Sequence, residues 1–102
     1  QVEILIVSEN FKNYGQKVLN ILENHEIRAH LDDRNETVGK KIRESEIKKI
    51  PFMIIVGENE VKNNSISIRK HHGEDIGEMK IEKFVDIIKK EISDCIPKFN
   101  IN

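Results

Sequence analysis

The sequence predicts a three-layer α/β/α domain, in which a mixed sheet of about five strands is covered by three helices. Two apolar, β-branched runs without alternation, Val2–Val7 and Phe52–Val56, are typical of strands buried on both faces. Segments with helical spacing separate the strands in the order βαβαβ, and right-handed crossovers then make the first three strands parallel. Strict polar/apolar alternation over residues 65–69 indicates a half-exposed strand of a hairpin near one edge.

Each element has its own signal along the chain. We expect strands at 2–7, 27–31, 52–56, 65–69 and 76–79, and helices at 11–24, 37–49 and 81–92. Ser8 and Asn10 are candidate caps for the first helix. In the second helix the side chains expected to face inward are Val38, Ile42, Ile47 and Ile50, and Pro51 prevents the helix from continuing.

The length and composition restrict the class of protein. A chain of 102 residues fits one compact domain, expected at residues 1–96 with a tail at 97–102. No run approaches the roughly 20 apolar residues of a membrane-spanning helix, so we expect no membrane partner. The single cysteine, Cys95, suits a reducing compartment, and we expect the cytoplasm, with an organelle as the alternative. Because the sequence runs from Gln1 straight into an apolar strand, we expect a piece of a longer protein.

Charge also limits the function. The chain carries 17 basic and 18 acidic residues, for a formal net charge of −1. General nucleic-acid binders usually carry a basic excess. Any nucleic-acid site in this chain must therefore depend on local charge.

Catalytic motifs are missing from the sequence. The five glycines form neither a phosphate-binding loop nor a dinucleotide turn, and no Ser or Cys lies on a nucleophile elbow. The adjacent His71 and His72 are expected as surface turn residues, because neighbouring side chains rarely converge on one metal ion. Asp32-Asp33 could suggest an acidic metal pocket. The preferred interpretation is that one of these Asp residues caps the second helix or pairs with Arg34. We therefore expect no catalytic residue, metal or cofactor here.

The remaining candidates follow the parallel strands or lie on the alternating strand, where open α/β sheets usually bind ligands. They are Arg34, Asn35, Arg43, Glu60 and Arg69. Amide, carboxylate and guanidinium groups suit the exposed edges of unpaired bases. Lys40, Lys41 and Lys70 are expected to attract the phosphate backbone. The alternative for Arg34 and Arg43 is a structural ion-pair set with Asp32, Asp33 and Glu44.

Several short motifs occur in the order and spacing of one known family. They are Asp33-Arg34-Asn35-Glu36, Gly39-x-Lys41-Ile42-Arg43-Glu44, Ile50-Pro51-Phe52-Met53-x-x-Val56-Gly57-x-x-Glu60-Val61, Ser67-Ile68-Arg69 and Gly73-Glu74-Asp75-x-Gly77. With them, the chain from about Val2 to Ile92 resembles the C-terminal anticodon-binding domain of threonyl-tRNA synthetases, which are class II aminoacyl-tRNA synthetases. Prolyl-, histidyl- and glycyl-tRNA synthetases share two of the motifs in looser form, and the stretch from Glu60 to Gly77 is what points to threonine.

The resemblance implies a function in translation. It implies the fold of the class II anticodon-binding domain and a grip on the anticodon loop of threonine tRNA. Glu60 and Arg69 would contact the middle guanine and third-position uridine, with Asn35 beside them and Arg43 in support. ATP and zinc, and a homodimer, would belong to the catalytic part of the full-length ligase. The family commonly has Gly before residue 65, and we expect Asn64 to preserve this turn, on which the register of Arg69 depends.

Two other functions remain open from the sequence. The first is the equivalent domain of a prolyl-, histidyl- or glycyl-tRNA synthetase, which would keep the fold and read another anticodon. The second is a stand-alone module that reuses the fold for protein contacts.

Overall fold

The computed structural model of the chain describes residues 2–71 and 74–95, the last four without their side chains. His72 and the expected tail lie outside the described residues. The elements are β1 (Val2–Ile6), the 3-10 helix η1 (Glu9–Phe11), α1 (Lys12–Asn24), β2 (Ala29–Asp32), α2 (Val38–Ile47), β3 (Phe52–Val56), α3 (Glu58–Asn63), β4 (Ile66–Lys70), β5 (Asp75–Met79) and α4 (Ile81–Cys95).

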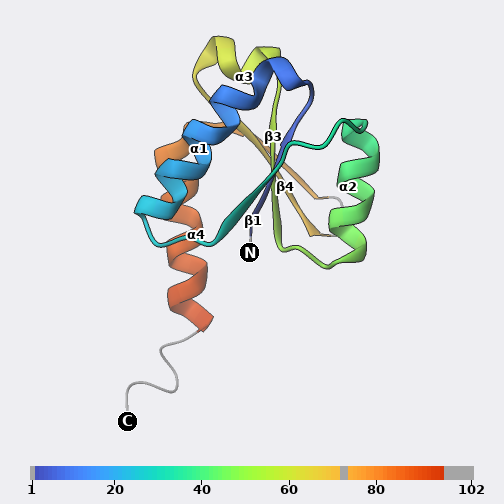
Figure 1. The fold of residues 1–102 in the computed structure, drawn as a ribbon. Coiled ribbons are helices and arrows are strands. Elements are labelled where there is room, and N and C mark those ends of the chain that lie inside the picture. Colours follow the sequence, from blue (N-terminus) through green and yellow to red (C-terminus); the bar gives the residue numbers. More distant parts are fainter. Residues whose placement is uncertain (1, 72–73, 96–102) are drawn as a thin grey trace.

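The strands form one mixed sheet in the order β2-β1-β3-β4-β5. β1 pairs in parallel with both β2 and β3, whereas β4 is antiparallel to both of its neighbours. Helices α1 and α4 cover one face of the sheet and α2 lies on the other, while α3 sits above the carboxyl end of β3 (Figure 1). The predicted three-layer class and mixed five-stranded sheet are therefore confirmed.

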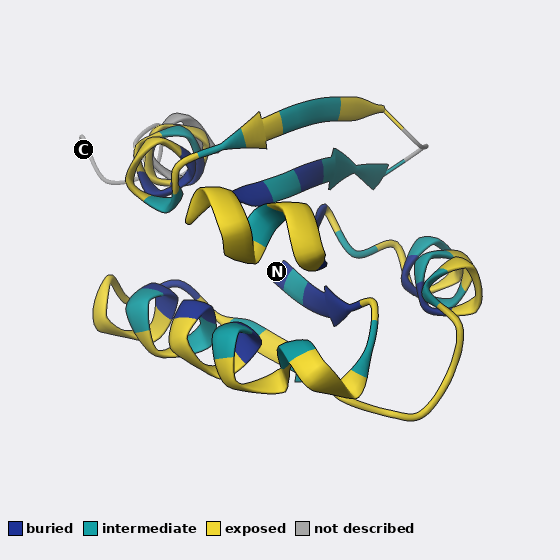
Figure 2. Ribbon diagram, turned by 90° about the horizontal axis from the view of Figure 1, so that it is seen from above, coloured by how far each residue is buried: buried dark blue, intermediate teal, exposed yellow. Residues whose placement is uncertain are grey.

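The main core lies between the sheet and helices α1 and α4, and Figure 2 shows the buried side of these helices turned toward the strands. It contains Val2, Ile4, Ile6, Val18, Leu22, Ile27, Phe52, Ile54, Val56, Ile66, Ile68, Phe84, Val85 and Ile88. The Phe52 and Phe84 rings meet edge to face, with 5.6 Å between their centroids. Gly15 lets α1 approach the sheet, since a Cβ there would lie 2.9 Å from the side chains of Ile6 and Leu31.

The sheet face toward α2 is covered less completely. Leu5 and Met53 are fully buried on this side, because β-strand side chains alternate and their neighbours belong to the main core. Among the described helices, only α2 lies on this face, and it packs against β1. The part of the face formed by β4 and β5 is therefore left without a helix in the described structure.

Two details of the prediction are wrong. Residues 58–63 form a helix, α3, that the sequence did not reveal, because Val61 is the only apolar side chain in this turn and a half and no helical spacing can appear. Ile47 was expected to face inward, yet 73% of it is exposed. Lys41 and Ser45 mark the buried face of α2, and Ile47 follows Ser45 by two residues, which places it on a different side of the helix.

Candidate nucleic-acid interface

The parallel strands end together at the upper edge of the sheet in Figure 1. A cavity of about 150 Å³ lies at this edge, between the loops that follow β1 and β2. Ser8 and Glu9 line it from the first loop, and Arg34 and Asn35 line it from the second. Three of the predicted site residues, Arg34, Asn35 and Lys41, thus share one cavity at the place where open α/β sheets usually bind ligands.

Asn35 lies in the exposed loop between β2 and α2. No hydrogen bond joins its side chain to the part of the chain that the structure describes, so its amide can donate to and accept from a ligand. The helix after the loop is capped by Thr37, whose Oγ1 accepts from the backbone N–H of Lys40 at 3.2 Å. Of the two roles predicted for Asp32-Asp33, the cap does not occur, because the loop separates both residues from the helix, whereas the pairing with Arg34 is confirmed for Asp32.

Arg34 links the loop between β2 and α2 to Asp32 and to Glu44. Its guanidinium donates to both carboxylate oxygens of Asp32, each at 2.8 Å, and also to Glu44 on α2. These hydrogen bonds are the main reason that the pKa of Asp32 is lowered and that of Arg34 is raised. The structural ion-pair alternative therefore holds for Arg34. Asp33 stands outside this set and pairs instead with Lys12, at 3.4 Å.

Glu60 lies in the first turn of α3, above the end of β3. Its Oε1 accepts from the backbone N–H of Gly57 at 2.8 Å, which ties down the start of the helix. Its Oε2 accepts from the Ser67 hydroxyl on β4 at 2.6 Å. A carboxylate offers about four acceptor positions, so two remain for a ligand. The carboxylate of Glu60 is therefore oriented in advance and still able to accept.

The turn from α3 into β4 is preserved. Asn64 has φ 54° and ψ 48°, the left-handed conformation that the family's usual glycine adopts readily and that Asn tolerates. The Ser65 hydroxyl and the Asn63 amide, the latter at 3.0 Å, both donate to the Glu78 carboxylate on β5 and lower its pKa. The expectation for Asn64 is confirmed, and the register of β4 is fixed on both sides.

Arg69 lies on the same face as Ser67, toward α2, because the residues on either side of Ser67 belong to the main core. Ser67 is in contact with Glu60, and Arg69 follows two residues later. Arg69 pairs with Met53, the second residue of β3, so its backbone lies farther from the upper edge than Glu60 does. The structure thus places Glu60 and Arg69 on one side of the sheet, with Ser67 between them.

A β-bulge accompanies Arg69. The pairing of β4 with β5 shifts register between Ile68 and Arg69, whose partners are Gly77 and Asp75. Gly77 has φ +105°, which other residues rarely adopt, and its N–H donates to the Asp75 carboxylate at 2.9 Å. Bulges twist the strand locally and re-aim side chains next to binding sites.

The three lysines predicted to attract phosphates have different environments. Lys40 is exposed on α2 and forms an ion pair with Glu36 at 3.1 Å, so it remains a candidate. Lys41 is only 1% exposed, which contradicts a surface role. Lys70 faces α4, where it pairs with Glu91 at 3.2 Å, and is therefore on the opposite face of the sheet from Arg69.

Sequence reasoning also underrated two residues. Ser67, which orients Glu60, was visible only as a member of the alternating strand. Lys41 lies on the same helical face as Val38 and Ser45, three and four residues away, and this spacing could have indicated its burial. Arg43 is exposed on α2, away from that face.

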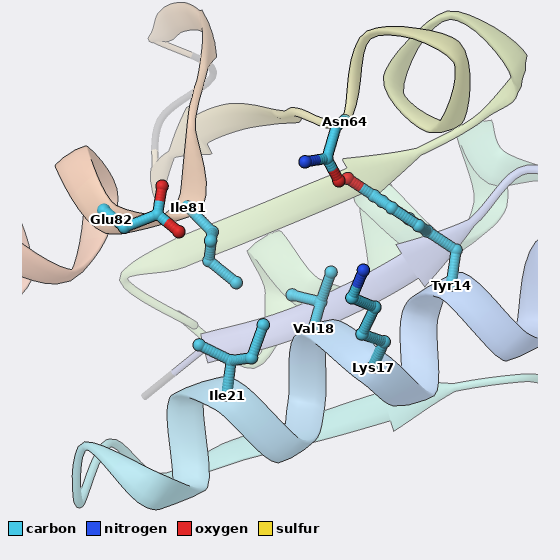
Figure 3. Close-up of a pocket in the computed structure, with 7 residues that line it drawn as sticks. All are labelled: Tyr14, Lys17, Val18, Ile21, Asn64, Ile81 and Glu82. Atoms are coloured by element: carbon cyan, nitrogen blue, oxygen red, sulfur yellow. The ribbon is translucent and has the colours of Figure 1, made fainter.

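A second cavity, of about 100 Å³, lies on the other face between α1 and the start of α4 (Figure 3). Tyr14 and Lys17 point into it from α1 and Glu82 faces them from α4. The Tyr14 hydroxyl donates to the backbone carbonyl of Ser65 at 2.8 Å, and burial, followed by Glu60 and Glu82, raises the pKa of Tyr14. None of the predicted site residues lines this cavity.

The described part of the chain contains neither a metal site nor a membrane-spanning helix. In residues 2–71 and 74–95, whose side chains are described up to residue 91, no three described His, Cys, Asp or Glu side chains are arranged to hold a metal ion. Over the same residues, no helix combines the length and apolar character needed to cross a membrane.

Comparisons with known proteins agree on one family. The family model described as "Anticodon binding domain" matches residues 1–91. The threonine–tRNA ligase of Flavobacterium johnsoniae is 53% identical over 103 residues, covering 99% of this chain and 16% of that ligase. The corresponding ligase of Bacteroides thetaiotaomicron is 48% identical over 99 residues, covering 97% of this chain and 15% of the ligase. The chain thus spans about one sixth of the length of these curated relatives.

Solved structures show the same fold. The RNA-binding domain of threonyl-tRNA synthetase from Cryptosporidium parvum superimposes with a TM-score of 0.81 at 24% identity, covering 88% of this chain and 23% of that one. Prolyl-tRNA synthetase from the same organism gives a TM-score of 0.81 at 24% identity, covering 92% and 21%.

Proposed function

The chain belongs to the anticodon-binding domain family, and on this premise we propose that it is the part of a threonine–tRNA ligase that reads the anticodon of threonine tRNA. The activation of threonine with ATP, and its transfer to tRNA, would take place in a catalytic domain outside this chain. Zinc binding and a homodimer would belong to that part as well, and the ligase would act in the cytoplasm or in an organelle.

The genetic code defines what such a domain must read. Threonine codons begin with A and C, so every threonine anticodon has guanine in the middle and uridine in the third position. The first position varies. The domain must therefore discriminate the middle and third bases of the anticodon and accept any base at the first position.

Glu60 is the proposed reader of the middle guanine. A carboxylate can accept from guanine N1–H and N2–H together, and no other base offers this pair of donors on one edge. The observation that carries the proposal is the orientation of the Glu60 carboxylate by Gly57 and Ser67, which leaves an acceptor position on each oxygen. Because the carboxylate is held before the ligand arrives, little conformational entropy is lost on binding.

Asn35 and Arg69 complete the proposed set. Arg69 lies on the same face of the sheet as Ser67, whose hydroxyl contacts Glu60, and would contact the neighbouring base. Asn35 lies at the cavity beside the upper edge and offers one donor and one acceptor group, which matches the imide edge of uridine. Arg43 would support the loop from α2, and Lys40 would attract its phosphates.

This arrangement agrees with a net charge of −1. Affinity for nucleic acid in general follows the number of phosphates that basic residues neutralise. Discrimination between bases depends instead on hydrogen bonds to their edges. A domain whose task is discrimination can therefore be nearly neutral overall.

The test is a binding panel of anticodon stem-loops, with Kd measured by fluorescence anisotropy at fixed salt. The threonine loop should bind best, and replacing its middle guanine should weaken binding by about 1–3 kcal/mol. Proline loops share the middle guanine but have guanine in the third position, while histidine loops end in U-G and glycine loops in C-C. Preference for one of these would favour the sister synthetase. Binding to none of the loops at low salt would favour the protein-contact module.

A further inference from the structure

Lys41 carries a buried ammonium group that has no role in the base contacts proposed above. Only 1% of the residue is exposed, and it is one of the large side chains that are fully buried in the described structure. Its position on α2, one residue after the exposed Lys40, places it on the side of the helix that packs against the sheet. A group so costly to bury is retained only if its hydrogen bonds are satisfied.

Those hydrogen bonds connect the ends of two strands. The ammonium Nζ donates to the backbone carbonyl of Ile6 at 3.2 Å and to the backbone carbonyl of Asp32 at 3.1 Å. Ile6 is the last residue of β1 and Asp32 is the last residue of β2. Lys41 therefore joins α2 to the carboxyl ends of two neighbouring strands, and it lines the same cavity as Asn35.

The charge of Lys41 is compensated at the same place. The Asp32 carboxylate is 5% exposed and is held by Arg34, which also binds Glu44 on α2. The positive charge of Lys41 contributes to lowering the pKa of Asp32. Asp32, which precedes the loop, is thus connected to α2 twice. Its backbone carbonyl accepts from Lys41, and its side chain is linked through Arg34 to Glu44.

The other ion pairs of the loop that carries Asn35, Asp33 with Lys12 and Glu36 with Lys40, are exposed, and such pairs contribute little to stability. The residues from 33 to 37 belong to no helix or strand and are exposed. Thr37 fixes the far end of the loop as the cap of α2. The direction in which the chain leaves β2, and with it the position of Asn35 over the cavity, depends on how the carboxyl end of β2 is held.

We propose that Lys41 is a positioning residue for base recognition: its ammonium fixes the carboxyl ends of β1 and β2 and thereby holds Asn35 at the cavity. This inference rests on the proposed function. Lys41 itself does not touch the base. Its effect on selectivity passes through the loop, and the Glu60 side of the interface, which is built on β3 and β4, is independent of it.

The test is a comparison of variants in the stem-loop assay. Lys41→Met keeps the length and apolar stem of the side chain but removes all three donors. Lys17→Met removes an exposed lysine charge on α1, outside the proposed interface, and is the matched control. Each is combined with Asn35→Ala and, separately, with Glu60→Gln. Folding is checked by circular dichroism and by the thermal midpoint.

The expected result is a specific coupling. In the wild-type chain and in Lys17→Met, Asn35→Ala should reduce discrimination at one base of the loop about tenfold. In Lys41→Met that discrimination should already be lost, so that adding Asn35→Ala changes it by less than about twofold. Glu60→Gln should keep its full effect in the Lys41→Met background. If Lys41 only stabilised the fold, Lys41→Met would lower the thermal midpoint, and adding Asn35→Ala to it would still reduce discrimination.

The contradicting results are equally distinct. If folded Lys41→Met keeps the Asn35-dependent discrimination, the positioning role is wrong. Should the Met side chain prevent folding, Lys41→Gln can still donate to one of the two carbonyls and gives the same comparison with the same criterion. A wild-type chain that discriminates no base would instead contradict the proposed function, so the two failures are distinguishable.

Discussion

Replacing Glu60 separates its structural role from its proposed reading role. Glu60→Ala removes both the hydrogen bond from Gly57 and the one from Ser67. Loss of a helix cap and of a hydrogen bond to a charged group should lower the free energy of unfolding by about 1–3 kcal/mol. Glu60→Gln keeps both contacts, because an amide oxygen can accept from Gly57 and an amide N–H can donate to the Ser67 oxygen, so its cost should stay below about 1 kcal/mol.

Both variants should lose discrimination for the middle guanine. An amide has one acceptor oxygen and presents N–H groups where guanine N1–H or N2–H needs a second acceptor. The loss of a bidentate contact costs about 1–3 kcal/mol, which is roughly 5- to 150-fold in the ratio of Kd values for guanine and adenine loops. Urea unfolding gives the stabilities and anisotropy gives the ratios. If Glu60→Gln is stable and still selects guanine, Glu60 is only a helix cap and the base assignment fails.

Three further predictions concern charge and packing. Lys40→Ala should weaken all stem-loops similarly and reduce the salt slope of log K by about 1, whereas loss of selectivity would show that Lys40 reads a base. Because the folded-state pKa of Asp32 is lowered, its ionisation stabilises the fold above the ordinary carboxyl pKa, and this contribution is lost as the pH falls through the folded value. Asp32→Asn should therefore flatten the fall in stability as the pH drops below about 4 in urea titrations, and an unchanged profile would contradict this. Gly15→Ala should lower the thermal midpoint, since its Cβ would lie 2.9 Å from side chains of β1 and β2, and an equal or higher midpoint would show that these side chains move aside freely.

The sheet was predictable because its signals are local. Val2–Ile6 and Phe52–Val56 are apolar on both faces, which identifies central strands, and the alternation around Ser67 identifies a strand with one polar face. Asn64 was predictable for the same reason, because its positive φ depends on the chemistry of one residue. The family resemblance drawn from the short motifs is confirmed by the family match and by the identity to threonine–tRNA ligases.

The features that were missed depend on tertiary structure. The helical spacing with Val38 and Ser45 is a weak local signal that separates Lys41 from Lys40, and the packing of α2 against the sheet makes one exposed and the other buried. Whether Arg34 reads a base or braces a loop was left open, because the answer depends on Glu44 reaching it from α2. Residues 58–63 carry too few apolar side chains to show a helical period. The helix start is stabilised instead by the Glu60 carboxylate, which accepts from the backbone N–H of Gly57.

The most direct test of the central claim is where a stem-loop binds on the chain. In an NMR titration of the ¹⁵N-labelled chain with the threonine anticodon stem-loop, the backbone amides that shift should be those of the loop at 33–37, of α3 and of β4. Those around the second cavity, near Lys17 and Glu82, should not shift. The same shifts should shrink when the middle guanine is replaced. Shifts concentrated on α1 and α4, or shifts that do not depend on the middle base, would contradict the account.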